Sequence, residues 1–186
     1  TPIEPFIVGP ANICTGSTET LSVGAKAERF ANDVIRSSSF FSNTEFNEVQ
    51  ILGTPSLFPA GGAQPGQWIS QSADNSREFI ELSFPGTGPI NFIRVFETFN
   101  PGSIDTISVL NPGTGSYEAV YTTTAAAVNL PAQVLEVEFP LTAFAVNQIR
   151  IALASDAVPG FNGIDAVSIG ENQESASFSA YNWSTG

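Results

Sequence analysis

Apolar and polar residues alternate along short segments in the second half of the chain. Between Gln133 and Phe139, leucine, valine and phenylalanine alternate with two glutamates, and residues 147–154 alternate isoleucine and leucine with more polar residues. A side-chain period of two places one side of an extended strand in a core and the other in water. These two segments are therefore predicted to be antiparallel strands with one wet face.

Similar segments recur from Arg77 onward and are separated by turn residues. Pro85-Gly86, Asn100-Pro101-Gly102 and Asn111-Pro112-Gly113 each follow such a segment, and there Pro presets one backbone dihedral while Gly accepts a positive φ. Residues 90–99 are apolar on both faces, which indicates a central strand covered on both sides. The predicted strands are 77–84, 90–99, 104–110, 116–123, 133–139, 147–154 and 163–169.

Helical periodicity is weak in this sequence. Residues 44–52 have the length of about two helical turns, with Thr44 as a possible cap and Thr54-Pro55 as the stop, and we predict one short helix there. The number and spacing of the strands favour an all-β, antiparallel β-sandwich of the jelly-roll type. A parallel β/α fold would need helices that this sequence does not supply.

The charge balance limits the partners. The chain of 186 residues has 18 acidic and 6 basic residues, for a formal net charge of −12, and Lys26 is the only lysine. Nucleic acids require a cationic surface that this composition does not provide, and anionic membranes are disfavoured for the same reason. No apolar run approaches the roughly 20 residues needed to cross a bilayer, so we expect no direct membrane insertion.

The sequence also lacks the usual residues of an active site. Histidine is absent and Cys14 is the only cysteine, which excludes an internal disulfide and the common zinc sites. A nucleophilic serine or threonine would have no ordinary base beside it. Carboxylates are abundant enough to form a hydrolytic pair, but most fall on polar strand faces, where solvated carboxylates belong. We therefore predict no enzymatic activity; the acids considered are Glu78, Glu81, Glu97, Glu136, Glu138 and Asp165.

Glu97 differs from the other acids because it falls on the same strand face as Ile93 and Val95. A partly buried carboxylate must find a partner or a proton. We predict a structural ion pair with Arg94 or Arg150 rather than a ligand site.

Several runs resemble one known family. They lie at 31–35, 49–55, 67–68, 77–82, 96–102 and 163–167, and the most specific is Glu-Thr-Phe-Asn-Pro-Gly at 97–102. Together, over about residues 28–170, they resemble a discoidin-like, galactose-binding-type jelly roll found in large secreted surface proteins of Bacteroidetes-type bacteria. The resemblance implies a non-enzymatic adhesin module on the bacterial cell surface or outside the cell, which binds glycans or another surface polymer. The alternative is a structural spacer with no ligand of its own.

The two ends resemble parts of an Ig-like or PKD-like repeat from the same kind of protein. The first segment is 7–17 followed by 20–23, and the second is 178–186, with Trp183 as its core aromatic residue. This implies Ig-like strands at 1–25, a jelly roll at 26–172 and a returning strand at 173–186, with neighbouring Ig-like domains in a longer parent chain. Segments 1–24 and 175–186 should then pair as antiparallel strands, with Leu21 and Trp183 facing one core. Alternatively, the ends are a linker and the first strand of a following domain.

Glycan binding requires an aromatic face for a sugar ring and amide or carboxylate groups for its hydroxyls, on loops at one end of the sandwich. Phe161 and Asn162, in a Pro-Gly-Phe-Asn-Gly loop, are the pair that we expect to be best exposed. Trp68 lies beside a strand, where a tryptophan is more often part of the core than a sugar platform. The full set of candidate ligand-binding residues is Phe41, Trp68, Phe99, Asn100, Phe161 and Asn162.

A structural calcium ion is the one cofactor that the resemblance implies. Jelly rolls of this type often hold a cation near their first and last strands, and calcium takes carboxylate and carbonyl oxygens. In this sequence that position corresponds to Asp33 and Asp165, with loop carbonyls from residues 40–47. No linear calcium-binding loop accompanies them.

Overall fold

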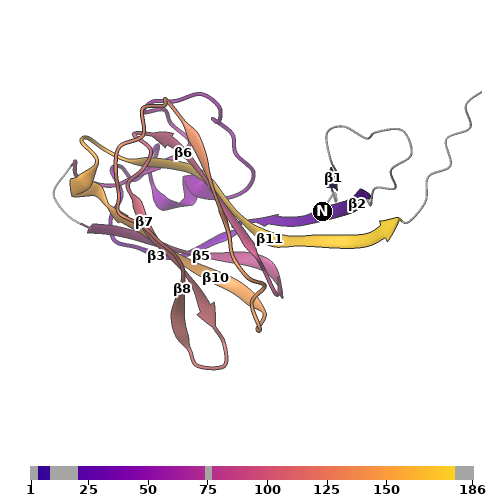
Figure 1. Cartoon of the computed structure of the whole chain (residues 1–186). Helices are drawn as coiled ribbons and strands as arrows, with labels where there is room; N and C mark the ends of the chain where they lie inside the picture. The colour runs from indigo at the N-terminus through magenta and orange to yellow at the C-terminus, as the bar shows by residue number, and fades with distance from the viewer. Residues whose placement is uncertain (1–3, 9–20, 74–76, 179–186) are drawn as a thin grey trace, which may run out of the picture.

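The computed structural model describes residues 4–8, 21–73 and 77–178, with side chains for 27–73 and 77–172. Two antiparallel sheets face each other (Figure 1). The first has the order β1 (Glu4–Val8), β2 (Leu21–Phe30), β11 (Gly163–Phe178), β6 (Phe92–Phe99) and β9 (Gln133–Glu138), and the short β4 (Trp68–Ile69) also pairs with β11. The second has the order β3 (Asp33–Ser37), β5 (Arg77–Gly88), β10 (Val146–Ala154), β7 (Ile104–Asn111) and β8 (Ser116–Thr122). The predicted all-β sandwich is confirmed.

The predicted strands correspond to β5 through β11, with small differences at their ends. The largest difference is β11, which was predicted to stop at Ile169 and continues to Phe178. The prediction for residues 90–99 is also confirmed, because β6 lies between β11 and β9. Ile93 and Val95 are buried on its core face, and Phe92 and Phe96 on the other.

The predicted helix at 44–52 is wrong. Only a single 3-10 turn forms, η1 (Glu48–Ile51), and Asn47 rather than Thr44 precedes it. In this segment a side-chain oxygen accepts a backbone N–H group that a helix would otherwise use. Ser42 Oγ accepts the N–H of Glu45 at 3.2 Å. Such local side-chain bonds compete with helix formation. A second 3-10 turn, η2 (Ser155–Ala157), follows β10.

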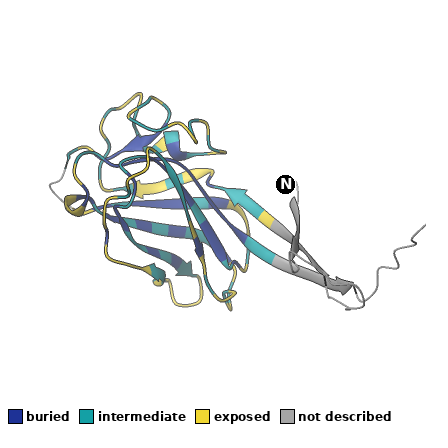
Figure 2. Ribbon diagram, turned by 45° about the horizontal axis from the view of Figure 1, so that its top comes forward, coloured by how far each residue is buried: buried dark blue, intermediate teal, exposed yellow. Residues whose placement is uncertain are grey.

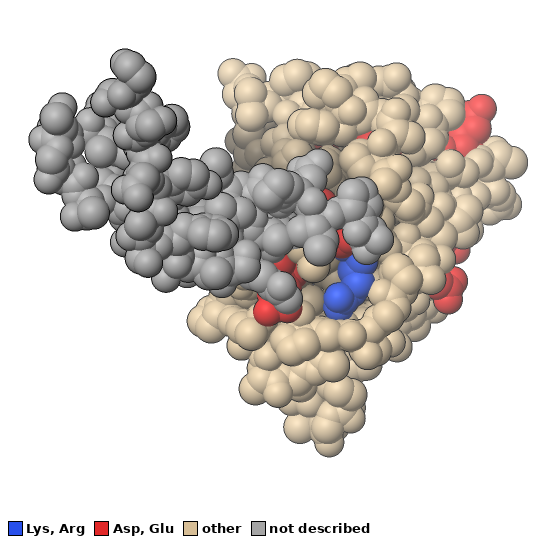
Figure 3. All heavy atoms as spheres, turned by 90° about the vertical axis from the view of Figure 1, so that its right-hand side faces the viewer, with Lys and Arg blue, Asp and Glu red and all other residues tan. Residues whose placement is uncertain are grey.

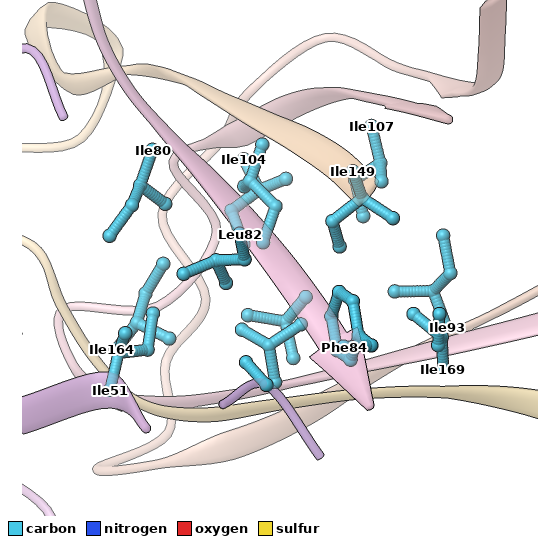
Figure 4. Packing of buried hydrophobic residues seen from close by; sticks show 14 of the residues in the cluster. Ile51, Ile80, Leu82, Phe84, Ile93, Ile104, Ile107, Ile149, Ile164 and Ile169 are labelled. Carbon is cyan, nitrogen blue, oxygen red and sulfur yellow. The ribbon is translucent and has the colours of Figure 1, made fainter. Parts of the chain in front are cut away.

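The core lies between the sheets. Alternate residues of β5 and β10 point inward, and Figure 4 shows part of the resulting cluster with Ile80, Leu82, Phe84 and Ile149. Figure 2 shows the same distribution along the ribbon, with buried residues on the strands and exposed residues concentrated in loops and turns. Each fully buried aliphatic side chain contributes about 1.5–3 kcal/mol, so this cluster is the main source of stability.

β2 and β11 extend beyond the sandwich as a paired ribbon, which we call the arm. Their register runs from Ser168 opposite Phe30 to Phe178 opposite Leu21, and β1 pairs with the outer side of β2. Figure 1 shows the arm projecting away from the sandwich. Residues 21–24 therefore lie beside 174–178, as expected for adjacent strands. Trp183 and Cys14 lie outside the described residues, and the division into an interrupted Ig-like repeat stays a prediction.

Charged side chains on the outer face of the first sheet pair locally. Arg94 on β6 contacts Glu136 at 2.9 Å and Glu28 at 3.5 Å, and Ser168 Oγ donates to Glu28. Figure 3 shows one side of the molecule, where basic atoms gather at one place next to acidic atoms and most of the described surface is uncharged. Among the described residues, no helix has the length and apolar character to cross a bilayer.

Candidate ligand-binding site at the loop end

One end of the sandwich collects most of the long loops. β6 and β10 end there, and their antiparallel partners β5, β7, β9 and β11 begin there. The loops at this end, which we call the loop end, comprise residues 38–67, 100–103, 123–132 and 155–162. Loops held on a rigid scaffold are common positions for binding residues.

Phe41, Phe46 and Phe161 form an aromatic cluster at the loop end. The Phe41 ring lies 5.3 Å from Phe161 and 5.8 Å from Phe46, in each case edge to face at 82°. The Phe41 backbone is held by its N–H, which donates to Ile69 O at 2.9 Å. Although Phe41 packs against two rings, 50% of its surface is exposed. The cluster therefore presents a fixed apolar surface to solvent, made from two loops far apart in the sequence.

Two asparagines hold the Phe161 loop in place. Asn162 is buried; its Oδ1 accepts Ser155 Oγ at 2.6 Å and its Nδ2 donates to Asn100 O at 2.9 Å. Asn100 has a positive φ of 44° and donates from Nδ2 to Phe161 O at 2.8 Å. The expectation that Asn162 is exposed is wrong, because its amide is used inside the protein. Asn162 positions Phe161 instead of facing a ligand.

The other predicted ligand residues have different positions. Trp68 is fully buried, and its Nε1 donates to Ser39 O at 2.9 Å, so it belongs to the core and not to a binding surface. Phe99 is partly exposed and pairs with Gly163 at the start of β11. The structure thus brings Phe41, Asn100, Phe161 and Asn162 into one network, which the sequence could not show, because the loops that meet depend on strand order.

Glu97 lines a pocket of about 220 Å³ at the loop end, which we call the Glu97 pocket. Only 2% of Glu97 is exposed, and its two oxygens accept Gly102 N–H at 2.9 Å and Gln133 Nε2–H at 2.6 Å. Burial raises the pKa of Glu97, while these two hydrogen bonds lower it in part. The residues around the pocket are Glu97, Gly102, Ile104, Tyr121, Thr123, Thr124, Ala126, Val128, Gln133 and Leu135.

The ion pair predicted for Glu97 is wrong. Arg94 points to the outer face of the sheet and contacts Glu136 and Glu28, and Arg150 contacts Glu81. Within the described part of the chain, Glu97 forms no ion pair. Its negative charge is balanced by hydrogen bonds alone, and sequence reasoning missed both this and the pocket.

The predicted metal ligands lie in different settings. Asp165 is buried and accepts the successive backbone N–H groups of Ser56, Leu57 and Phe58 at 2.9–3.2 Å, with Ser56 Oγ as a fourth donor. Successive N–H groups of this kind form an anion-binding nest. Asp33 is exposed, and its Oδ1 accepts the N–H of Val34. Among the described residues, no three acidic, histidine or cysteine side chains gather as a metal site, and the cation stays a prediction.

The candidate catalytic carboxylates are less solvated than predicted. Glu78, Glu81 and Asp165 are 5%, 3% and 2% exposed. Each has polar partners that explain its burial: Glu78 accepts the hydroxyls of Ser38 and Ser39, and Glu81 accepts two bonds from Arg36 at 2.8 and 2.9 Å. Buried carboxylates are tolerated when such partners are present.

Comparisons with solved structures identify related sandwiches. A family 32 carbohydrate-binding module from Streptococcus pneumoniae EndoD matches with a TM-score of 0.54 and 8% identity, over 75% of this chain and 94% of that chain. Chitosan-binding module 1 from a chitosanase/glucanase of Paenibacillus sp. IK-5 matches with a TM-score of 0.51 and 16% identity, over 72% and 91%. The N-terminal domain of the single-strand break repair protein XRCC1 matches with a TM-score of 0.53 and 13% identity, over 77% and 98%.

These similarities confirm the discoidin-like sandwich fold. The identities are low, and one fold hosts unrelated functions, as a carbohydrate-binding module and a repair protein among the neighbours illustrate. No protein-family model and no curated protein matches the sequence. The function must therefore be argued from the residues at the loop end.

Proposed function

We propose that this chain is a non-enzymatic carbohydrate-binding module whose glycan ligand contacts Phe41 and Phe161 at the loop end. The observation that carries the proposal is the edge-to-face pair of these rings, 5.3 Å apart, in which Phe41 is exposed, Phe161 is partly exposed, and Asn100 Nδ2 donates to Phe161 O. Sugar rings have apolar C–H faces that pack on aromatic side chains, and their hydroxyls bond to nearby polar groups. Solved carbohydrate-binding modules with the same fold add support.

The composition favours a glycan over a nucleic acid. The formal charge of −12 would repel a phosphate backbone. A neutral or cationic sugar polymer meets no such repulsion. The buried carboxylates of Glu78, Glu81 and Asp165 are occupied by other side-chain or backbone donors, which supports a binding role over hydrolysis.

We further propose that the module lies on the bacterial surface as part of a long protein with Ig-like repeats. The arm supports this, because β2 and β11 leave the sandwich side by side as paired strands. Such a double connection fits a module inserted into a neighbouring domain. The same observation favours the second candidate function, a rigid spacer without a ligand, because two paired strands restrict rotation more than one linker does.

A glycan-array screen of the full chain tests the binding proposal. Wild type is compared with Phe41→Ala and Phe161→Ala, and with Leu141→Ala as a matched control, since Leu141 is also 50% exposed but lies outside the loop end. Binding that both phenylalanine variants lose and the control keeps is expected. Running each array with calcium and with a chelator tests the predicted cation at the same time. Absence of binding by the folded chain would overturn this proposal and favour the spacer.

A further inference from the structure

The turn at residues 100–102 contacts both the Glu97 pocket and the aromatic cluster. Asn100 bonds to Phe161 O on one side, and Gly102 N–H bonds to Glu97 on the other. Gly102 has a φ of 105°, and a side chain there would approach Ala126 O to 2.1 Å. The turn is therefore fixed in shape, and it connects the pocket to the aromatic cluster through these two bonds.

The lining of the pocket combines polar and apolar side chains. Tyr121, Thr123 and Thr124 contribute hydroxyl-bearing side chains to its lining, and Ile104 and Leu135 contribute apolar ones. At about 220 Å³ it is smaller than a typical drug-sized site. A pocket of this size, with both polar and apolar side chains in its lining, fits one small hydroxylated ring.

The carboxylate of Glu97 distinguishes this pocket from an ordinary hydroxyl-binding one. An ionised carboxylate has about four acceptor positions, and Glu97 uses two, for Gly102 N–H and Gln133 Nε2–H. No lysine or arginine is among the pocket residues. Buried charges in proteins are ordinarily paired. A ligand that brings both a hydrogen-bond donor and a positive charge would supply what the protein does not.

We propose that the Glu97 pocket binds the protonated amino group of an amino sugar, with Glu97 as the acceptor. The inference rests on the proposed glycan-binding function and deepens it by naming the class of sugar. A neutral hydroxyl would donate to one lone pair of the carboxylate but leave its negative charge unbalanced. An ammonium group donates a hydrogen bond and also balances the charge. N-acetylation would remove that charge and add bulk, so the pocket discriminates against acetylated units.

Isothermal titration with short oligomers of glucosamine and of N-acetylglucosamine tests this inference. We expect the wild-type chain to bind the free-amine oligomer at least tenfold more tightly than the acetylated one. Glu97→Gln should reduce that preference to near unity, because the amide still accepts Gly102 N–H but carries no charge. Glu45→Gln, which removes one exposed charge at the same end, should leave the preference unchanged.

A second variant keeps the test sound if Glu97→Gln folds poorly. Ala126 is exposed and lines the pocket, so Ala126→Leu should obstruct the pocket without altering Glu97, and should also remove the preference. Thermal unfolding of each variant identifies any loss of fold.

The outcomes separate the two proposals. Equal binding of both oligomers that still depends on Phe41 would overturn the amino-sugar inference and leave glycan binding intact. Binding of neither oligomer nor any array glycan would overturn both. Glu97-dependent binding of cadaverine or lysine, without binding of the sugar oligomers, would show that the pocket accepts amines from another source and would overturn the amino sugar as its ligand.

Discussion

Glu97 accepts the backbone N–H of Gly102 at 2.9 Å, five positions further along the chain, and so closes the turn that ends β6. This bond accounts for the Glu-Thr-Phe-Asn-Pro-Gly run as a structural unit. The glutamate provides the acceptor, while Asn100 and Gly102 adopt positive φ values. The same carboxylate lines the neighbouring pocket, so a turn and a candidate binding site share one side chain.

Glu97 should make stability depend on pH. Burial raises its pKa above the usual 4.5, so ionisation costs the folded state more than the unfolded one. The stability linked to the protonated form is fully present below the unfolded pKa and is lost as pH rises through the raised folded value. Relative to Glu97→Gln, the wild type should therefore gain stability as pH falls across that window. Denaturant unfolding of both proteins at several pH values measures this, and a pH-independent difference would contradict it.

Removal of the Glu97 side chain should have a different effect from neutralising it. Glu97→Ala removes the acceptor of the part-buried bonds from Gly102 N–H and from the Gln133 amide, and an unsatisfied buried polar group costs about 1–3 kcal/mol. We expect a loss of unfolding free energy in that range or above it, measured by urea denaturation. Glu97→Gln serves as the control, because its one amide oxygen still accepts the turn bond from Gly102 N–H; equal losses in the two variants would show that the charge, and not the turn bond, is responsible.

Asp165 should be important for stability even without a metal ion. It accepts three successive backbone N–H groups of residues 56–58, and hydrogen bonds to a charged group contribute about 1.5–3 kcal/mol each. Asp165→Ala should lower the unfolding free energy by at least about 2 kcal/mol, whereas Asp33→Ala at an exposed position should change it by no more than about 0.5 kcal/mol.

The same two variants test the predicted calcium ion. If Asp33 and Asp165 hold it together, both variants should abolish any stabilisation by added calcium, and a chelator should lower the melting temperature of the wild type only. A chelator without effect on the wild type would contradict the ion.

The sequence predicted strands β5 to β11 well, because alternation is a local signal, but it did not predict β3 or the two-residue β4. It located β9 from Leu135 and Val137 facing one way and the glutamates the other. It failed where a residue's role depends on distant partners. Asn162 sits in a loop of turn-forming residues that suggested exposure, yet Ser155 and Asn100 enclose it. The identity of those neighbours is a consequence of strand order, which no local pattern records.

Glu97 illustrates the same limit, because its burial was predicted correctly and its partner was not. Its burial was predicted from the face it shares with Ile93 and Val95. One of the two arginines expected to neutralise it, Arg94, lies three positions before Glu97, and this odd separation places its side chain on the other side of the sheet, where Glu136 and Glu28 bind it. Arg150 lies on the second sheet, on the outer face, beside Glu81.

The pKa of Tyr117 reports on the outer face of the second sheet, where its phenol lies near Glu81. Glu81 is buried there beneath Arg36 and Arg150, which both lie over the Phe79 ring, at 5.3 and 4.2 Å. Burial, with the nearby Glu81 charge, raises the pKa of Tyr117 to about 12. The stability associated with its neutral phenol is fully present below the usual value of 10.0 and is lost as pH rises from there through about 12.

Ultraviolet titration of tyrosinate measures this shift directly. The difference between wild type and Tyr117→Phe isolates the Tyr117 signal, whose midpoint should lie near 12. Glu81→Gln should move the midpoint down, because it removes a repulsive charge while Arg36 and Arg150 still favour the phenolate. Since Glu81 is remote in sequence from Tyr117, a midpoint that ignores this substitution would mean that β5 and β8 do not share this face of the sheet in solution.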